Sequence, residues 1–480
     1  MNFMLKKMAA PLVLFAVSIF AWFNAASLDS QSGKEFSSQV PDTNTSLITP
    51  LLSARRLPVF LQAPIADNEL RNEVENLVAQ LPGLSCINLL EDGRVIFEQL
   101  SNEPVIPAST QKLLTASVLL KNFGPDHKFS TKVISETQPV NGVLKDDLWV
   151  IGGGDPVLMT SKYAERYKDP FLYTDIKDLG LQILSSGINH IEGSLIGDES
   201  LFDEKRFVDS WPERFRHTDQ KQAGPISALS LNAGFVRWDP VKESNGFNTP
   251  ADEPAEYTAS VLKEILEDNG ITVTGQTMTG IAPETAFFEI ATVESPTMKE
   301  IISKMLLGSD NTTAEILLKG LSARVETPGT SRGGAEIVAD SLKVSGYDME
   351  RVEVVDASGL DYGNRVTCKL LTELLDTGSH AGDLKQSLPI TGKSGTLRKR
   401  LLDTPAEGRV RGKTGSLNGV VSLAGVVDTI FERSLSFAFV TNFDGDKGRI
   451  KYLHDEILLE MIKYPQGPSI DLLEPIVPDE

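Results

Sequence analysis

The 480-residue sequence contains only two cysteines and five histidines. It has no C-x-x-C and no H-E-x-x-H segment, so the spacings typical of zinc and iron–sulfur sites are absent. Basic residues are also scarce, because 46 Lys and Arg stand against 66 Asp and Glu, a formal net charge of −20. That charge repels a phosphate backbone and argues against a nucleic-acid partner. We therefore expect chemistry carried by Ser, Lys, Asn or carboxylate groups, with no metal and no cofactor.

Apolar residues make up 41% of the chain and charged residues 23%. This balance is typical of a folded protein and not of a disordered, collagen-like or coiled-coil chain. At ~150 residues per domain, the length predicts two or three structural units. Cys86 and Cys368 lie far apart in the sequence. We expect them to be separate buried thiols, with a disulfide as the alternative.

Residues 1–27 have the order of an export signal. Two lysines precede an apolar run from Met8 to Phe23, and small residues follow it. This order predicts a chain exported to the periplasm or another extracytoplasmic part of the cell envelope. The run approaches the ~17 residues that can span a bilayer, so an uncleaved N-terminal membrane anchor is the alternative. Residues 28–55, which are rich in Ser, Asn, Gln and Pro, are predicted to be a linker.

Strand patterns occur near both ends of the remaining chain. Residues 84–100 form two apolar segments around Glu91-Asp92-Gly93, which is a strong hairpin signal. A helix is expected from Ser109 to Gly124. Later, two strands and a helix are predicted at 419–427, 435–441 and 449–462. Strands at both ends with helices between them predict an α+β fold with one sheet assembled from both ends of the chain.

The pattern of predicted secondary structure changes between about residues 129 and 292. Short strands and Gly-rich turns prevail there, with two amphipathic helices near 176–185 and 257–268. This pattern predicts an inserted α+β region.

The first candidate catalytic motif is Ser109-Thr110-Gln111-Lys112. A serine hydroxyl is inert at neutral pH until a base takes its proton, and a lysine three residues later on the same helix face can do so. Ser109 begins a helix, whose first N–H groups can stabilise an oxyanion. Ser260 and Lys263 have the same spacing, but they belong to an amphipathic surface helix and are expected to be solvated.

The second motif is Ser309-Asp310-Asn311. The Ser309 hydroxyl can relay a proton to a leaving amine, and the Asn311 amide can hold the lysine and bind a substrate carbonyl. The same sequence is also a good helix N-cap, and both interpretations can hold together. Ser230-Leu231-Asn232 has a similar form inside the inserted region.

The third motif, Lys413-Thr414-Gly415-Ser416, enters an apolar strand. On an edge strand, a lysine charge and two hydroxyls can bind a carboxylate, and the glycine lets a ligand approach the backbone. Lys393-Ser394-Gly395 also fits the pattern. A charged, loop-like sequence follows it, so we prefer Lys413.

A different serine mechanism would use the segment 329–333, which has the G-x-S-x-G form of a nucleophile elbow. Such an elbow follows a strand. Here a helical sequence and Pro328 precede it, so a loop between helices is predicted. No histidine lies in a sequence context that marks a triad base; the five are His127, His190, His217, His380 and His454.

Taken in order, with about 200 residues between the first two, the three motifs resemble those of penicillin-interacting serine enzymes. Among these, the chain resembles the class C low-molecular-mass penicillin-binding proteins, the D-alanyl-D-alanine carboxypeptidase/endopeptidase family S13. The resemblance runs through nearly the whole mature chain, in IPASTQKLLTA, LWVIGGGDPVL, SGINHIEGSLIGDESLFDE, PISALSLNAG, GSDNTTAEILLK, DASGLDYGNRVT and GKTGSLNGVVSLAGVV. Two positions depart from the family pattern, since Ser416 replaces a common Thr and Ala357 a common Gly.

The resemblance implies a β-lactamase/transpeptidase-like domain, an antiparallel sheet with helices on both faces. Two smaller domains would be inserted between the first and second motifs. The expected boundaries are 56–131 and 294–480 for the catalytic domain, 132–156 and 214–293 for an inserted domain, and 157–213 for a second domain nested inside it.

The resemblance also implies roles for single residues. The catalytic residues would be Ser109 as acylated nucleophile, Lys112 as its general base and Ser309 as proton relay. The substrate-binding residues would be Asn311, Lys413, Thr414, Gly415 and Ser416. Within this set, Lys413 and Thr414 would bind the carboxylate of the terminal D-Ala. The N–H groups of Ser109 and Ser416 would form the oxyanion hole.

The implied substrates are peptidoglycan stem peptides ending in D-Ala–D-Ala. Ser109 would attack the D-Ala–D-Ala amide, D-Ala would leave, and water would hydrolyse the acyl-enzyme, whereas a penicillin would acylate the same serine and leave slowly. Lys112 must be largely neutral to act as base, which burial beside Lys413 favours. Two other functions stay open. A serine β-lactamase is one, although no E-x-x-L-N-like segment lies between Ser309 and Lys413; a non-catalytic receptor for β-lactams or cell wall is the other.

Overall fold

The computed structural model describes residues 57–215, 222–240 and 248–466. The predicted export signal or anchor at 1–27 and the predicted linker at 28–55 lie outside these residues. Within the described ranges, no helix is both long enough and apolar enough to cross a membrane.

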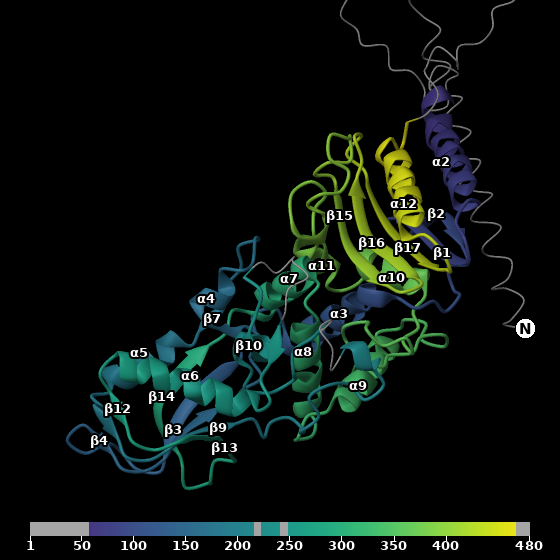
Figure 1. Cartoon of the computed structure of the whole chain (residues 1–480). Helices are drawn as coiled ribbons and strands as arrows, with labels where there is room; N and C mark the ends of the chain where they lie inside the picture. The colour runs from purple at the N-terminus through teal and green to yellow at the C-terminus, as the bar shows by residue number, and fades with distance from the viewer. Residues whose placement is uncertain (1–56, 216–221, 241–247, 467–480) are drawn as a thin grey trace, which may run out of the picture. The chain divides into compact units, whose positions relative to one another are not determined.

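The main sheet has five antiparallel strands in the order β15-β16-β17-β1-β2 (Figure 1). Its strands are β1 (Leu84–Glu91), β2 (Arg94–Gln99), β15 (Val410–Leu417), β16 (Val420–Asp428) and β17 (Ser434–Asn442). β1 pairs with β17 and places Cys86 opposite Val440. The N-terminal hairpin and the C-terminal strands therefore form one sheet, as predicted, and β15 with the third motif is at its edge.

Helices cover both faces of the main sheet, because alternate residues of each strand point to opposite sides. On one face, Ile87 and Phe437 pack with α2 (Leu57–Val78) and α12 (Lys447–Ile462). On the other, Ala438 and Val440 face a layer of helices. That layer contains α3 (Lys112–Phe123), α7 (Met298–Gly308), α8 (Asn311–Ala323), α9 (Ser331–Val344), α10 (Cys368–Asp376) and α11 (Ala381–Ser387).

The inserted region contains a second five-stranded sheet in the order β13-β9-β5-β3-β14 (Figure 1). Its strands are β3 (Ser130–Ser135), β5 (Leu148–Ile151), β9 (Leu195–Asp198), β13 (Thr277–Thr279) and β14 (Phe288–Glu294). Helices α5 (Lys177–Ser185) and α6 (Pro254–Asp268) pack against it. Smaller elements complete the region: β4 (Val143–Leu144), β6 (Leu158–Met159), α4 (Ser161–Ala164), β7 (Thr174–Asp175), β8 (His190–Ile191), β10 (Phe235–Arg237), β11 (Thr249–Pro250) and β12 (Thr272–Val273).

The segment 157–213, expected as a nested second domain, supplies strands to sheets that it shares with the segments around it. Its strand β9 pairs with β5 on one side and with β13 on the other. Its residues Ile183 and Leu195 belong to the same apolar cluster as Val150 and Leu262. These strands and this core are therefore common to the nested and the flanking segments. The domain boundaries given above stay a prediction.

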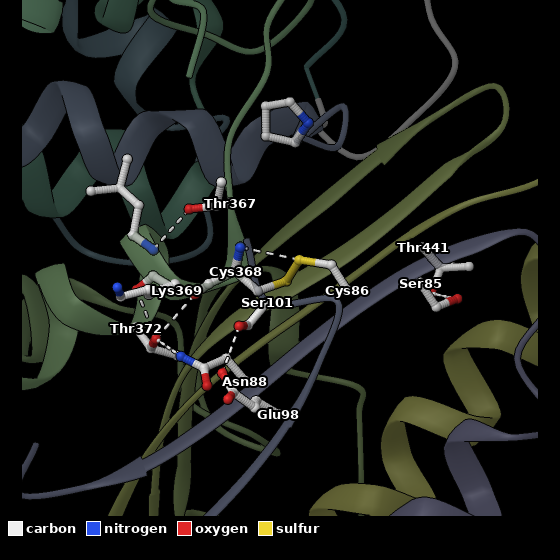
Figure 2. Close-up of a disulfide and its surroundings, with 12 residues drawn as sticks. Ser85, Cys86, Asn88, Glu98, Ser101, Thr367, Cys368, Lys369, Thr372 and Thr441 are labelled. Carbon is white, nitrogen blue, oxygen red and sulfur yellow. Dashed lines mark hydrogen bonds between the residues drawn. A yellow bond between two sulfur atoms is a disulfide. The ribbon is translucent and has the colours of Figure 1, made fainter. Parts of the chain in front are cut away.

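The two cysteines form a disulfide (Figure 2). Cys86 lies on β1 and Cys368 begins α10, and their Cα atoms are 5.9 Å apart. The expectation of separate thiols is wrong, because α10 packs across the sheet and brings together residues that are 282 positions apart. Beside the bond, the Asn88 side-chain amide donates to Thr372 Oγ1 at 2.5 Å. The disulfide thus ties the first strand to α10.

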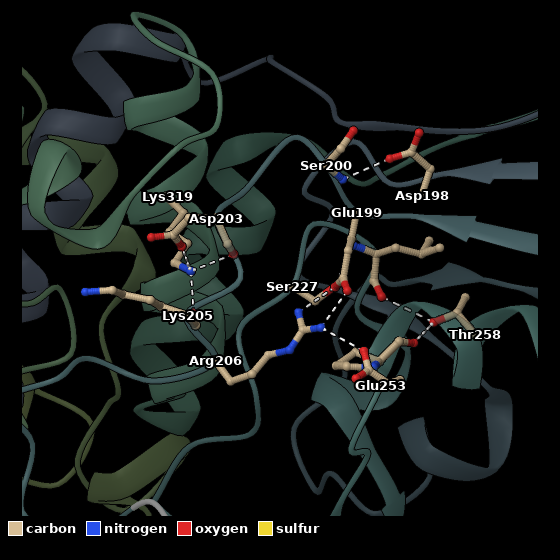
Figure 3. A network of polar contacts seen from close by, with 12 residues as sticks. Asp198, Glu199, Ser200, Asp203, Lys205, Arg206, Ser227, Glu253, Thr258 and Lys319 are labelled. Atoms are coloured by element: carbon tan, nitrogen blue, oxygen red, sulfur yellow. Dashed lines mark hydrogen bonds and ion pairs between the residues drawn. The ribbon is translucent and has the colours of Figure 1, made fainter. Parts of the chain in front are cut away.

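A partly buried polar network joins the inserted region to α8 (Figure 3). Lys319 on α8 is fully buried and pairs with Asp203. Nearby, the Arg206 guanidinium donates to both carboxylate oxygens of Glu199 at 2.6 Å. Because α8 begins at Asn311, this network holds the inserted region against the helix that carries the second motif.

Candidate active site

The three sequence motifs meet at one cleft of about 600 Å³. Residues of all three line it, namely Ser109, Ser309, Asn311, Thr414, Gly415 and Ser416. The side chains of Lys112 and Lys413 are fully buried behind this lining. The structure therefore brings together all eight residues that the sequence singled out as catalytic or substrate-binding.

Ser109 lies on a tight turn that is held from two sides. It belongs to the short 3-10 helix η1 (Ala108–Gln111), and Ala108 has a left-handed φ of 48°, the kind of strain found at functional sites. The Ser422 hydroxyl on β16 donates to the Pro107 carbonyl at 2.6 Å. On β15, a Cβ at Gly415 would stand 2.9 Å from the Ser109 nitrogen. Only glycine therefore lets the edge strand lie this close to the serine.

Lys112 connects the first motif to the second. Its Nζ lies 3.2 Å from Ser109 Oγ. It also lies 2.7 Å from Asn311 Oδ1 and 2.6 Å from the Ser358 carbonyl oxygen. The lysine is thus placed against the serine hydroxyl by two fixed acceptors.

Lys413 connects the third motif to the second. Its Nζ donates to Ser309 Oγ at 2.8 Å and to the Thr414 carbonyl at 2.7 Å. Burial, together with the charge of Lys112, lowers the pKa of Lys413 well below its ordinary value. Ser309 itself ends α7 in a left-handed conformation with φ 51°. A chain of contacts therefore runs between the two lysines through the second motif.

The capping interpretation of the second motif is confirmed. Asp310 is the N-cap of α8 and accepts a hydrogen bond from the Thr313 N–H at 3.1 Å. Ser309 and Asn311, on either side of it, line the cleft. One tripeptide thus begins the helix and presents two polar side chains.

Two competing serine motifs do not contribute their serines to the lining of the cleft. On α6, the Ser260 hydroxyl donates to the Tyr257 carbonyl of its own helix, and Lys263 Nζ donates to the Gly275 carbonyl. Ser331 begins α9 after the N-cap Thr330. The predicted loop between helices holds for Gly329 and Thr330, whereas residues 331–333 form the first turn of α9.

The structure adds Glu315, which the sequence analysis did not single out. It lies on α8 one helical turn after Asn311 and is fully buried. Its Oε1 accepts hydrogen bonds from the Ala357 and Ser358 N–H groups at 3.2 and 2.8 Å. The Ser358 carbonyl in turn accepts from Lys112. Glu315 therefore positions the loop that holds Lys112. Its i+4 spacing from Asn311, which places both on one helix face, is the sequence signal that could have identified it.

Asp356 organises the same loop. Its buried carboxylate accepts hydrogen bonds from the Gly359 N–H at 2.7 Å, the Asn364 amide at 2.8 Å and the Trp211 indole N–H at 2.8 Å. Trp211 comes from the inserted region. A Cβ at Gly359 would collide with the Ala108 carbonyl oxygen at 1.9 Å, so this loop packs directly on the turn that carries the nucleophile.

Glu315→Gln is expected to change how folding stability depends on pH. Burial, with the charge of Asp356, raises the pKa of Glu315 from 4.5 to about 8, while Lys112 opposes the shift. Between these values the folded protein keeps a proton that the unfolded chain has lost. Stability from this group is therefore complete below about pH 4.5 and falls as the pH rises toward about 8. The facing charges are Asp356, Lys112 and, on the same helix, Lys319.

The measurement is urea unfolding at pH 5 and pH 9. From the lower to the higher pH, the wild type should lose on the order of 4 kcal/mol of unfolding free energy relative to Glu315→Gln. The exposed Glu336→Gln on α9 serves as the control and should follow the wild type. An identical pH dependence in the wild type and Glu315→Gln would contradict the assignment.

Comparison with known proteins decides the family. The model of the D-Ala-D-Ala carboxypeptidase 3 (S13) family matches residues 70–249 and 242–455. The chain belongs to this family. It is 29% identical over 422 residues to the D-alanyl-D-alanine carboxypeptidase of Actinomadura sp. (strain R39), covering 73% of this chain and 76% of the relative. It is 35% identical over 389 residues to penicillin-sensitive carboxypeptidase A of Dictyostelium discoideum, covering 67% and 74%.

A solved structure supports the fold. Penicillin binding protein 4 of Haemophilus influenzae superposes with a TM-score of 0.68 at 22% sequence identity, covering 82% of this chain and 99% of that one. The family and the α+β fold predicted from the sequence are confirmed. With them the class of enzyme is confirmed, a serine-type D-Ala-D-Ala carboxypeptidase of the S13 hydrolases.

Proposed function

We propose that this protein hydrolyses the D-Ala–D-Ala bond of peptidoglycan stem peptides through an acyl-enzyme on Ser109. The single observation that carries the proposal is the position of Lys112 Nζ, 3.2 Å from Ser109 Oγ. A serine needs a base at hydrogen-bond distance to become a nucleophile. Lys112 is the group in that position.

Two acceptors fix the orientation of Lys112, whose neutral form is the one that can act as the base. A neutral amine has two N–H donors and one lone pair. Asn311 Oδ1 and the Ser358 carbonyl take the two N–H groups, which leaves the lone pair directed at the Ser109 hydroxyl. In this arrangement the proton passes from Ser109 Oγ to Lys112 Nζ while Oγ attacks the carbonyl carbon of the scissile bond.

The leaving D-Ala needs a proton on its amine. Ser309 is placed to supply it, because its hydroxyl lines the cleft and accepts a hydrogen bond from Lys413 Nζ at 2.8 Å. The proton that Lys112 took from Ser109 replaces the one that Ser309 gives up, so Lys112 is neutral again when water attacks the acyl-enzyme. Lys112 takes the water proton and returns it to Ser109 Oγ as the peptide is released. The N–H groups of Ser109 and Ser416 serve as donors to the oxyanion in both steps.

The substrate lies along β15. Thr414 and Ser416 present hydroxyls on this strand, and Gly415 between them lets the peptide approach the backbone beside Ser109. Asn311 is held by Lys112 through its Oδ1 and by the Gln222 carbonyl through its Nδ2 at 2.8 Å, so its amide is oriented at the edge of the cleft.

Penicillin acts on this protein as an inhibitor that acylates Ser109. A class A β-lactamase releases that adduct rapidly through a glutamate that activates a water molecule. Among the described residues that line the cleft, none is Asp or Glu. Asp356 lies between the second and third motifs, and its carboxylate is hydrogen-bonded within its own loop. This arrangement favours the peptidase over the β-lactamase.

The substrate places the protein in the cell envelope. The export signal predicted for residues 1–27 agrees with that location. A membrane tether through this N-terminal segment is the alternative, and it would keep the protein in the same compartment.

The proposal is tested by incubating the purified protein with a stem peptide ending in D-Ala–D-Ala and with cross-linked muropeptide dimers. The wild type is expected to release D-Ala from the first substrate, to split the second, or to do both. Ser109→Ala should do neither, and Ser260→Ala should match the wild type. Product formation by Ser109→Ala at the wild-type rate would overturn the proposal.

A further inference from the structure

The cleft over Ser109 is positively charged although the chain is acidic. Four of the described residues that line it are Arg or Lys and none is Asp or Glu; the four are Arg214, Arg400, Lys447 and Lys451. The whole chain carries a formal net charge of −20. A local cluster of the opposite sign attracts anionic groups into the cleft.

Two of these four cations already have partners. Arg400 pairs with Asp455 at 2.5 Å. The Arg214 guanidinium lies 4.6 Å from the centre of the Phe215 ring and donates to the Tyr362 hydroxyl at 3.1 Å. Both side chains are thereby fixed in the wall of the cleft.

Lys447 and Lys451 differ, since neither forms an ion pair with any residue in the described part of the chain. They lie one turn apart on α12, so both project toward the same side of the helix. Lys451 is exposed and Lys447 is partly exposed. Two accessible positive charges therefore stand together in the cleft that contains the nucleophile.

Lys447 is directed at the strand that binds the substrate. Its Nζ donates to Ser416 Oγ at 3.4 Å. Ser416 follows Gly415, whose Cβ, if present, would stand 2.9 Å from the Ser109 nitrogen. The leaving group is a single D-Ala, so its carboxylate lies within about one residue length, ~3.8 Å, of the scissile bond. Ser416 and Lys447 are in the region where that carboxylate must lie.

The side chain of Lys413, the cation assigned above to this carboxylate, is directed at the second motif. Its side chain is fully buried, and its Nζ donates to Ser309 Oγ and to the Thr414 carbonyl. These hydrogen bonds hold the Lys413 side chain against the second motif. On the open side of β15, Lys447 offers a further positive charge for the substrate carboxylate.

We propose that Lys447, supported by Lys451, binds the free C-terminal carboxylate of the substrate and makes the enzyme selective for peptides that end in a free acid. This inference rests on the proposed function, because it names a contact to the D-Ala that leaves. Ser416 and Thr414 contribute hydroxyl hydrogen bonds to the same group. The lysines contribute its counter-charge.

The test compares the release of the C-terminal residue from two synthetic peptides. Both end in D-Ala–D-Ala, one with a free C-terminal acid and the other with a C-terminal amide. For Lys447→Ala and Lys447→Gln, kcat/KM for the acid should fall about 10- to 100-fold, mainly through KM, because a charge-assisted contact is lost. The value for the amide should change less than about 2-fold. Lys447→Arg should restore the preference for the acid, and Lys451→Ala should give a smaller loss, about 3-fold.

Arg449→Ala is the matched control, since Arg449 is an exposed cation on the same helix that does not line the described cleft. It should leave the acid-to-amide ratio unchanged. If the wild type releases D-Ala while Lys447→Ala, Lys447→Gln and the Lys447→Ala/Lys451→Ala double variant keep its acid-to-amide ratio, the inference is overturned and the proposed function stands. If the wild type cleaves neither peptide and forms no penicillin adduct, both are overturned.

Discussion

Lys112→Ala is expected to lower the rate of acylation of Ser109 by penicillin about 1,000-fold. The lysine Nζ lies 3.2 Å from Ser109 Oγ, so the substitution removes the group that takes the serine proton. It also leaves Asn311 Oδ1 and the Ser358 carbonyl without their shared donor. Stopped-flow or gel-based labelling with a fluorescent penicillin, at saturating and limiting drug, measures the loss.

Two control variants separate the base from a structural role. Lys112→Arg keeps N–H donors and much of the volume, but a guanidinium cannot lose its proton in a protein. It should therefore be as slow as Lys112→Ala while its thermal unfolding stays close to that of the wild type. Lys263→Ala removes the lysine of the competing motif on α6 and should label normally. Normal acylation in Lys112→Ala would show that another group activates Ser109.

Opening the Cys86–Cys368 disulfide should cost the largest share of stability of any change considered. The two residues are 282 positions apart, so the bond closes most of the described chain into a loop. In the chain-entropy model a loop of this size is worth about 5.6 kcal/mol, and native disulfides typically contribute about 2–5 kcal/mol. We expect Cys86→Ala/Cys368→Ala to lower the unfolding free energy by about 3–5 kcal/mol in a urea titration.

Reductant provides the control for this prediction. Dithiothreitol should shift the urea midpoint of the wild type toward that of the double variant and leave the double variant unchanged. Penicillin labelling of Ser109 should persist in the double variant at low urea, because the disulfide lies between β1 and α10 and outside the lining of the cleft. A loss of less than about 1 kcal/mol would contradict the stabilising role.

The predictions that were confirmed rest on local patterns. The hairpin at 84–100 follows from two apolar segments around Glu91-Asp92-Gly93, and the structure forms β1 and β2 there. The apolar run after Ser109 predicted the helix, and Gly124 predicted its end. In the structure Gly124 has a φ of 85°. The edge position of β15 was expected from the third motif. Each of these signals lies within about 20 residues of sequence, where propensity and periodicity act.

The features that sequence analysis missed depend on contacts between distant segments. The disulfide needs α10 to cross β1, and no spacing rule predicts that crossing. Lys447 reaches the cleft only because α12 packs on β16, which brings its first turn beside Ser416 of β15. Glu315 resembles an ordinary helical glutamate until the fold buries it against Ser358. Burial and pairing of charges are tertiary properties, so a linear pattern does not contain them.

The central claim is that Ser109 is the acylated nucleophile. It is tested most directly by incubating the purified protein with a fluorescent penicillin and locating the label by peptide mass mapping, with Ser109→Ala and Ser260→Ala as controls. We predict one stable adduct, on the peptide that contains Ser109, absent in Ser109→Ala and present in Ser260→Ala. An adduct on another residue, rapid drug turnover without an adduct, or labelling that survives Ser109→Ala would contradict the account.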